Sequence, residues 1–300
     1  MKKLRTILLA TDFGKSSDNL LRYAMGLAKI FQSRIIPVYV LPDDIKKETV
    51  TLLLRETAIK RLDILQDKMK AGGLETMEYV LESGNPRDKI IEVAQKVNAD
   101  LILMGSGEKV KGIFLHLSDL TTKVIRRSPK PVWVVKQEDE LDIRRIICAV
   151  SFSAQSKRAL KNTITLARKF KAGLIIFSVS EIYHQGTLRR TAYWDKVNEK
   201  ERLVHVSKLN SFLSDLDLSG IDCKTEVVSG RPSKAILNAI SRQKSDLLIM
   251  GTTEKSFLDR LMMGSVTERV VEKVPCSFVT LKNEDIIDIP RKIRIRKKKR

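Results

Sequence analysis

The stretch Asp100-Leu-Ile-Leu-Met-Gly105 returns 146 positions later as Asp246-Leu-Leu-Ile-Met-Gly251. The opening apolar stretch Ile7–Ala10 matches Ile146–Ala149 at an offset of 139, so the second copy is longer by the difference, seven residues. Self-similarity at a long, nearly fixed period indicates a repeated structural unit. We therefore interpret the chain as two copies of one fold, in which each position can be compared with its counterpart.

The bulk composition is that of a globular chain. Its 300 residues fit two domains of about 150 residues each. Apolar residues make up 43% and charged residues 31%. No apolar run approaches the roughly 18 residues that a membrane helix needs, so we expect no membrane span. After Met1-Lys-Lys-Leu-Arg5 the stretch Ile7–Ala10 is shorter than the signal-peptide core of about 7–15 residues, and we interpret it as a buried strand.

The three cysteines, Cys148, Cys223 and Cys276, lie in apolar stretches of the second copy, with no paired spacing and no histidine nearby. We expect buried, reduced thiols, which are typical of a reducing compartment. The sequence therefore predicts a cytoplasmic protein.

The chain is strongly basic, with 56 basic and 36 acidic residues and a net charge of +20. Its last ten residues, Arg291–Arg300, contain eight of the basic residues and no acid. A run of like charges favours disorder, and a positive tail attracts nucleic acid phosphates or an anionic membrane surface. A tail that is only solvated is the alternative.

Short apolar runs alternate with stretches of helical periodicity. In the first copy the runs are 4–11, 35–41, 75–82, 101–104 and 132–135, and in the second they are 146–150, 174–179, 223–228, 247–250 and 277–281. The longest amphipathic stretch carries Ala58, Leu62, Leu65 and Met69 on one side. This order predicts two tandem, doubly wound, five-stranded parallel sheets with helices on both faces, a Rossmann-like α/β fold. We place the domains at residues 1–138 and 142–283, followed by a tail at 284–300.

A ligand crevice is expected at the carboxyl ends of the strands, where the strand order reverses. In the second copy these ends hold Ser151, Val179 and Met250-Gly251. Beyond them Gly264-Ser265-Val266 opens a helix. Glycines at such places let a phosphate approach backbone N–H groups, and a serine adds a hydroxyl donor. The pattern predicts an anion-binding site.

These residues resemble the universal stress protein family in its tandem two-domain form, and the resemblance covers nearly everything but the tail. The family's ATP-binding members share the motif G-x2-G-x9-G-[S/T]. Gly251 matches its first glycine and Gly264-Ser265 its closing pair, whereas Glu254 stands at the middle glycine. The resemblance implies that Val179 packs on adenine and that Ser151 replaces an aspartate that contacts the nucleoside. It also implies a fold like that of the adenine-nucleotide hydrolases.

Two interpretations of the second copy stay open. One is binding of ATP or another adenine nucleotide, with phosphate held at Gly264-Ser265. The other is a decayed site that serves only as a loop, because Glu254 places negative charge near the phosphates and Ser151 weakens nucleoside recognition. A variant of the first interpretation has Glu254 hold Mg²⁺ against the phosphates. We assign no other metal ligand and no catalytic residue.

The first copy departs from the motif in another way. Asp12, Val40 and Gly105 match the family pattern and are weaker candidates for nucleotide binding. The closing pair becomes Ser118-Asp119, which places a carboxylate where a phosphate binds. Two like charges about 4–5 Å apart repel by roughly 3–4 kcal/mol at an effective dielectric constant of 20. We therefore expect the first copy not to hold ATP in the family manner.

The resemblance implies a sensing and binding module of the stress response, with ATP as the possible ligand of the second copy. It also implies that the fifth strands of the two copies pair, giving an internal pseudo-dimer, and a homodimer of such units stays open. Two other classes remain. One is a slow ATPase or autophosphorylating enzyme of the same fold, although His116, His184 and His205 are scattered and no acid, base and nucleophile converge in the sequence. The other is an accessory protein that grips nucleic acid or an anionic surface through Arg291–Arg300.

Overall fold

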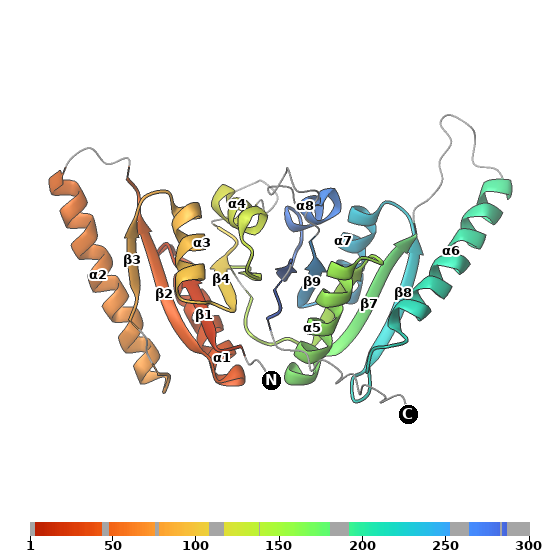
Figure 1. Cartoon of the computed structure of the whole chain (residues 1–300), viewed down its shortest axis with the longest axis horizontal. Coiled ribbons are helices and arrows are strands. Elements are labelled where there is room, and N and C mark those ends of the chain that lie inside the picture. Colours follow the sequence, from red (N-terminus) through yellow and green to blue (C-terminus); the bar gives the residue numbers. More distant parts are fainter. Residues whose placement is uncertain are drawn as a thin grey trace, which may run out of the picture.

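The structure is a computed structural model of the chain, drawn in Figure 1, and it describes residues 4–43, 48–75, 78–107, 117–137, 139–180, 192–252, 264–282 and 284–286. The strands are β1 (Thr6–Ala10), β2 (Arg34–Leu41), β3 (Val80–Ser83), β4 (Leu101–Gly105), β5 (Val132–Val135), β6 (Arg145–Val150), β7 (Gly173–Ser180), β8 (Cys223–Ser229), β9 (Leu247–Gly251) and β10 (Ser277–Leu281). The helices are α1 (Ser17–Phe31), α2 (Glu48–Ala71), α3 (Pro86–Lys96), α4 (Asp119–Arg127), α5 (Ala154–Phe170), α6 (Ala192–Leu213), α7 (Pro232–Gln243) and α8 (Ser265–Val271).

The strands form one sheet in the order β3-β2-β1-β4-β5-β10-β9-β6-β7-β8. Within each half the neighbouring strands run parallel, and the order reverses beside β1 and β4 and beside β6 and β9. The halves meet through β5 and β10, which run antiparallel. The prediction of two doubly wound, five-stranded parallel sheets is confirmed, and the fifth strands join them.

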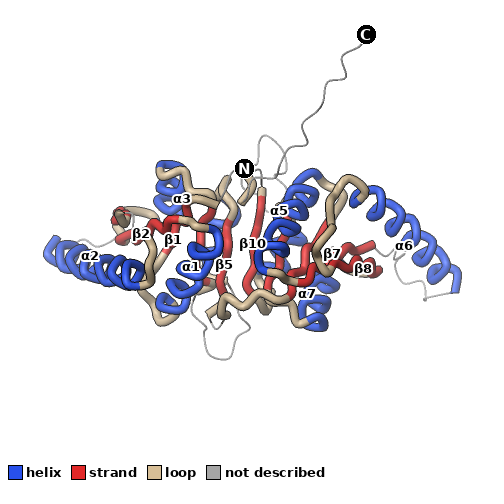
Figure 2. Tube along the Cα trace, turned by 90° about the horizontal axis from the view of Figure 1, so that it is seen from below, coloured by secondary structure: helices blue, strands red, loops and turns tan. Residues whose placement is uncertain are grey.

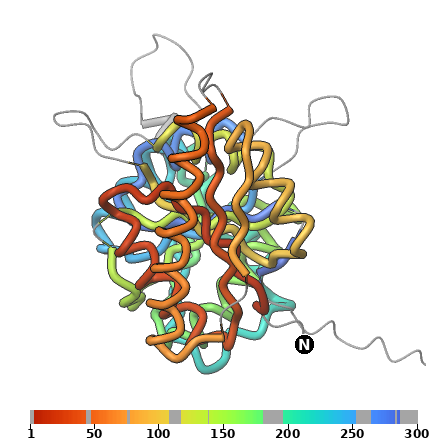
Figure 3. Tube along the Cα trace, turned by 90° about the vertical axis from the view of Figure 1, so that its left-hand side faces the viewer, coloured from red at the N-terminus to blue at the C-terminus, as the bar shows by residue number. Residues whose placement is uncertain are grey.

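Helices cover both faces of this sheet, and each face has a core that runs through both halves. One core contains side chains of α1, α2, α5 and α6, and the other contains those of α3, α4, α7 and α8. Figure 3, seen from the first-half edge, shows α1 and α2 on one side of the strands and α3 on the other. Strands β1 and β6 are buried almost throughout, because both of their faces are covered. That burial explains their unbroken apolar runs.

The outer strands and helices are less buried. Figure 2 shows α2 and α6 at opposite ends of the molecule. Helix α2 buries Ala58, Leu62, Leu65 and Met69, as its periodicity predicts. Strand β3 is shorter than the predicted 75–82, because it pairs with β2 alone and none of its residues is fully buried.

Aromatic side chains fill one side of the junction between the halves. Trp133 of β5 is fully buried and lies opposite Val279 of β10. Its ring centroid is 6.0 Å from that of Tyr23 and 6.4 Å from that of Phe170, which belongs to the other half. Phe31 also meets Phe170, at 5.8 Å. Edge-to-face pairs of this kind contribute about 0.5–1.5 kcal/mol each beyond their buried area.

Ion pairs span the other side of the junction. Helices α4 and α8 lie side by side there (Figure 1), and Arg126 of α4 pairs with Glu268 of α8. Lys130 pairs with Glu284 at 2.8 Å, and the ammonium of Lys282 donates to the carbonyl of Arg126. The halves therefore meet as the protomers of a two-fold dimer do, within one chain.

All three cysteines are free thiols; Cys148 and Cys276 are buried, whereas Cys223 is partly exposed. Burial raises the pKa of Cys148 and of Cys276 to about 12, so both stay protonated and unreactive near neutral pH. In the part of the chain that the structure describes, no helix combines the length and the apolarity needed to cross a membrane.

Candidate functional site

The second-half candidates lie where the sequence places them. Ser151 follows β6, Val179 lies near the end of β7, and Met250-Gly251 ends β9. Because β6 pairs with both β7 and β9, these ends are neighbours along one edge of the sheet. Gly264 is the N-cap of α8, and Ser265 and Val266 are its first residues. Glu254 lies outside the described residues, as do the basic residues that follow β4 and β9 in the sequence, namely Lys109, Lys111, Lys255 and Arg260.

Gly251 has a packing reason to be glycine. A Cβ on Gly251 would lie 2.6 Å from the backbone carbonyl of Gln155 and 2.9 Å from the backbone nitrogen of Ser156. Both belong to the first turn of α5, which thus presses directly on the end of β9. At the equivalent Gly105 the nearest atom, the Oγ of Ser16, is 3.9 Å away. The first motif glycine is therefore required by helix packing in the second half.

A cluster of hydroxyl groups surrounds Ser151. Its N–H donates to the Oγ of Ser156 at 3.0 Å, and its own Oγ lies 3.0 Å from that oxygen and 3.1 Å from the Oγ of Ser153. Ser153 caps α5 by accepting the N–H of Ser156 at 3.1 Å. The cluster is uncharged, and hydroxyl groups both donate and accept hydrogen bonds. It can therefore contact a sugar or a phosphate.

The first half places a carboxylate in the same position. The Oδ1 of Asp12 accepts the N–H of Gly14 at 2.8 Å and the hydroxyl of Ser17 at 3.3 Å. Asp12 is exposed, whereas Val40 is buried beneath this end of the sheet. These two candidates and Gly105 are therefore brought to one edge, as Ser151, Val179 and Gly251 are in the second half.

The start of α4 is bonded to the end of β4 in the first half. The N–H of Ser118 donates to the carbonyl of Ser106 at 3.0 Å, and the hydroxyl of Thr121 donates to the carbonyl of Gly105 at 3.1 Å. Gly107, at φ 91°, lies so close that a Cβ there would be 2.6 Å from the Cβ of Ser118. The Oγ of Ser118 accepts the N–H of Thr121 and caps the helix. Little of this helix start is left for a ligand.

The start of α8 is different. Gly264 provides no side-chain cap, and Ser265 is exposed. Thr267, the counterpart of Thr121, is buried, and among the described residues its hydroxyl makes no bond like that of Thr121 to Gly105. The first-turn N–H groups and the hydroxyl of Ser265 therefore have no side-chain partner in the described part of the chain.

Sequence reasoning missed a group formed by Phe152, Ser178 and His205. Phe152 is 40% exposed, and its ring lies 4.8 Å from that of His205 and 5.8 Å from that of Phe212. The Nε2 of His205 lies 2.8 Å from the Oγ of Ser178. Since Ser178 donates its hydroxyl hydrogen to the carbonyl of Val150 at 3.0 Å, Nε2 is the donor to Ser178.

The environment of His205 keeps its ring neutral. Burial lowers its pKa from the ordinary 6.5, and the positive charge of Lys208 lowers it further. The recurrence of Phe13 as Phe152 was the available sequence signal, because both follow the first strand of their half. Phe13, at φ 57°, instead packs on Tyr39 at 4.7 Å.

Within the described ranges no cluster of three or more histidine, cysteine or acidic side chains has metal-binding geometry. Ser178 is buried and its hydroxyl hydrogen is already donated, so it does not act as a nucleophile toward a ligand in the crevice.

The fold and these strand ends define a class: a tandem, doubly wound α/β protein whose candidate residues lie at the carboxyl ends of the strands in each half. The universal stress protein family model matches residues 3–136 and again residues 142–282. The chain therefore belongs to the universal stress protein family, with two such domains in tandem.

Known proteins resemble either one half or the whole chain. Universal stress protein MJ0531 of Methanocaldococcus jannaschii is 27% identical over 139 residues, 46% of this chain and 82% of that protein. Universal stress protein E of Photorhabdus laumondii is 22% identical, covering 94% of this chain and 96% of its own length. The crystal structure of a universal stress protein from Archaeoglobus fulgidus DSM 4304 matches with a TM-score of 0.70 at 23% identity, covering 92% of this chain and 98% of that one.

Proposed function

We propose that this tandem universal stress protein is a stress-response binding module that holds an adenine nucleotide in its second half and none in its first. The resemblance described above supports the choice of half. The second half keeps Gly251 and Gly264-Ser265 of the ATP-binding motif, whereas the first half has Ser118-Asp119 at the closing pair.

The observation that carries this proposal is the contrast between the starts of α4 and α8. Ser118 and Thr121 bond to the strand end and to each other in the first half. Gly264 and Thr267 make no such bonds within the described chain. In the described chain a phosphate would therefore meet, at the start of α8, a first turn with no side-chain cap, whereas Ser118 caps the first turn of α4. Because α8 has only seven residues, its dipole is a minor contribution.

The neighbouring side chains supply the remaining contacts that a nucleotide needs. Val179 offers an apolar surface to the base, and Ser151 offers hydroxyl bonding to the sugar. The exposed ring of Phe152 stands at the same strand end as Ser151. Stacking of a base on an aromatic ring contributes about 1–3 kcal/mol. The three free thiols, two of them buried, favour a reducing compartment such as the cytoplasm.

Isothermal titration of ATP into the full chain tests the proposal. We expect one site per chain. The pair Gly264→Ser and Ser265→Asp, which gives α8 the closing residues of α4, should weaken binding by on the order of a hundredfold, because a carboxylate then faces a phosphate. The control is Asp119→Ser, which leaves α4 capped by Ser118 and should change nothing.

Two results would reject the proposal: no heat at millimolar ATP, or a single site that survives the double substitution. Repeating the titration with Mg²⁺ tests the role given to Glu254. A single-turnover assay with labelled ATP separates this binding module from a slow ATPase or autophosphorylating enzyme.

A further inference from the structure

Helices α3 and α4 pack together in the first half as α7 and α8 do in the second, but the charges of the two helix pairs are arranged differently. In the first pair Asp88 pairs with Arg87 at 2.5 Å and with Arg127 at 3.5 Å. Lys123 pairs with Asp119 one turn away. These cations of α3 and α4 are thus neutralised by carboxylates of the same two helices.

In the α7–α8 groove the corresponding acid is missing. At the offset of 146, Lys234 stands in the place of Asp88. Lys234, Arg269 and Lys273 are exposed, and none is ion-paired with a carboxylate among the residues that the structure describes. Like charges held near one another repel, so an anion placed between them is stabilised.

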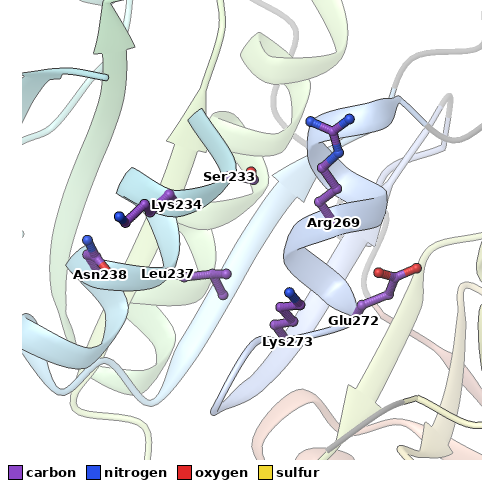
Figure 4. Close-up of a pocket in the computed structure, with 7 residues that line it drawn as sticks. All are labelled: Ser233, Lys234, Leu237, Asn238, Arg269, Glu272 and Lys273. Atoms are coloured by element: carbon purple, nitrogen blue, oxygen red, sulfur yellow. The ribbon is translucent and has the colours of Figure 1, made fainter. Parts of the chain in front are cut away.

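These side chains line a pocket of about 460 Å³ (Figure 4). Pockets for small molecules range from about 300 to 1,000 Å³. Leu237 projects from α7 toward α8; the ammonium of Lys273 lies on the α8 side of it, whereas the ammonium of Lys234 points away from α8 in this view. Ser233 and Asn238 add hydrogen-bonding groups. The pocket therefore combines an apolar floor, cations and neutral donors.

Charge indicates which ligand fits. The carboxylate of Glu272, the acid that lines the pocket, points away from α7 in Figure 4. Three cations and this carboxylate leave two positive charges, and a phosphate monoester carries about −1.5 to −2 near neutral pH. We propose that the α7–α8 groove binds a small phosphate monoester dianion.

This site is separate from the nucleotide crevice. The pocket between α7 and α8 is not lined by the candidate nucleotide-binding residues Ser151, Val179 and Gly251. Binding here does not depend on ATP binding in the crevice, so either proposal can fail without the other.

Titration of glycerol phosphate and of inorganic phosphate into the full chain, in a phosphate-free buffer of low ionic strength, tests the inference. We expect saturable binding at one site, with a dissociation constant on the order of 1 mM. The pair Lys234→Asp and Asn238→Glu installs the acids found at Asp88 and Glu92, and should weaken binding at least tenfold. Lys273→Gln, which leaves α7 unaltered, should weaken it several-fold.

The matched control is the pair Lys196→Asp and Lys200→Gln, which changes the charge equally on exposed positions of α6, on the other face of the sheet. It should bind both phosphates as the wild type does. Binding that survives the α7 substitutions, or falls equally in the control, would overturn the inference, as would an absence of saturation at tens of millimolar. Loss of ATP binding together with phosphate binding in the α7 variant would assign the phosphate to the crevice and reject the groove.

Discussion

Gly105 and Gly251 end equivalent strands in the two halves, yet their surroundings differ. Around Gly105 the nearest atom to a Cβ would be 3.9 Å away, whereas at Gly251 the backbone of α5 would be 2.6 Å away. The helix that follows each of these strands differs in the reverse sense. Helix α4 is bonded to the end of β4 through Thr121, whereas α8 has no such bond to the end of β9 in the described chain. One fold thus keeps its strand pairing while the end of β4 is bonded to the helix that follows it and the end of β9 is packed against α5.

The largest expected effect tests whether the halves share one core. Trp133→Ala should lower the free energy of unfolding by about 3–5 kcal/mol, because the ring is fully buried and contacts both halves. Val279→Ala, at the paired position of β10, removes fewer buried atoms and should cost about 1.5–3 kcal/mol. Equilibrium denaturation in urea measures both. Equal costs would contradict the view that Trp133 joins the halves.

The two strand-end glycines give the next comparison. Gly251→Ala should destabilise the protein by about 1–3 kcal/mol, because the added Cβ overlaps the backbone of Gln155. Gly105→Ala has room and should stay within about 0.5 kcal/mol of the wild type. Thermal melts of the two variants provide the test. A Gly251→Ala variant as stable as the wild type would show that α5 does not press on β9.

A smaller effect is expected on the charged side of the junction. Arg126→Gln breaks the ion pair with Glu268. The side chain of Arg126 is 40% exposed and that of Glu268 is 32% exposed. Exposed pairs contribute about 0–1 kcal/mol and are weakened by salt. The loss should therefore be below about 1 kcal/mol and should vanish in high salt. A larger, salt-independent loss would mean that polar contacts, and not the aromatic cluster, hold the halves together.

Where His205 lies against Phe152 in the second half, Arg61 lies over Phe13 in the first, at 5.5 Å, and His205 therefore predicts a small pH dependence that belongs to the second half. Its pKa is lowered in the folded protein by burial and by Lys208, so the unfolded chain binds more protons as the pH falls through 6.5. Stability should therefore decrease between about pH 7.5 and pH 5.5. His205→Gln keeps a donor for Ser178 and should flatten this slope in urea titrations. If stability changed with pH in the His205→Gln variant as it does in the wild type, the pH dependence would come from other titratable groups.

The repeat made the fold predictable. Buried strands such as Ile146–Val150 are unbroken apolar runs, and the stripe from Ala58 to Met69 is buried as its spacing predicts. Strand β3 was predicted too long, because an edge strand with partly exposed residues has no sharp apolar boundary.

The candidate site was less predictable, because its differences depend on contacts between distant residues. The bonds of Ser178 and His205 join β7 to α6, and nothing in their spacing indicates this. Sequence placed Gly251 in a ligand motif, whereas its close contact with α5 appears only in three dimensions. The domain boundaries, the homodimer and the role of Arg291–Arg300 stay predictions; of the tail placed at 284–300 the structure describes only residues 284–286.

The most direct test is a crystal structure of the chain with a non-hydrolysable ATP analogue. We expect density in the second half alone, with phosphates at Gly264-Ser265 and the base between Val179 and Phe152. Density for the analogue beside Asp12 and Gly105, or in both halves alike, would contradict the account.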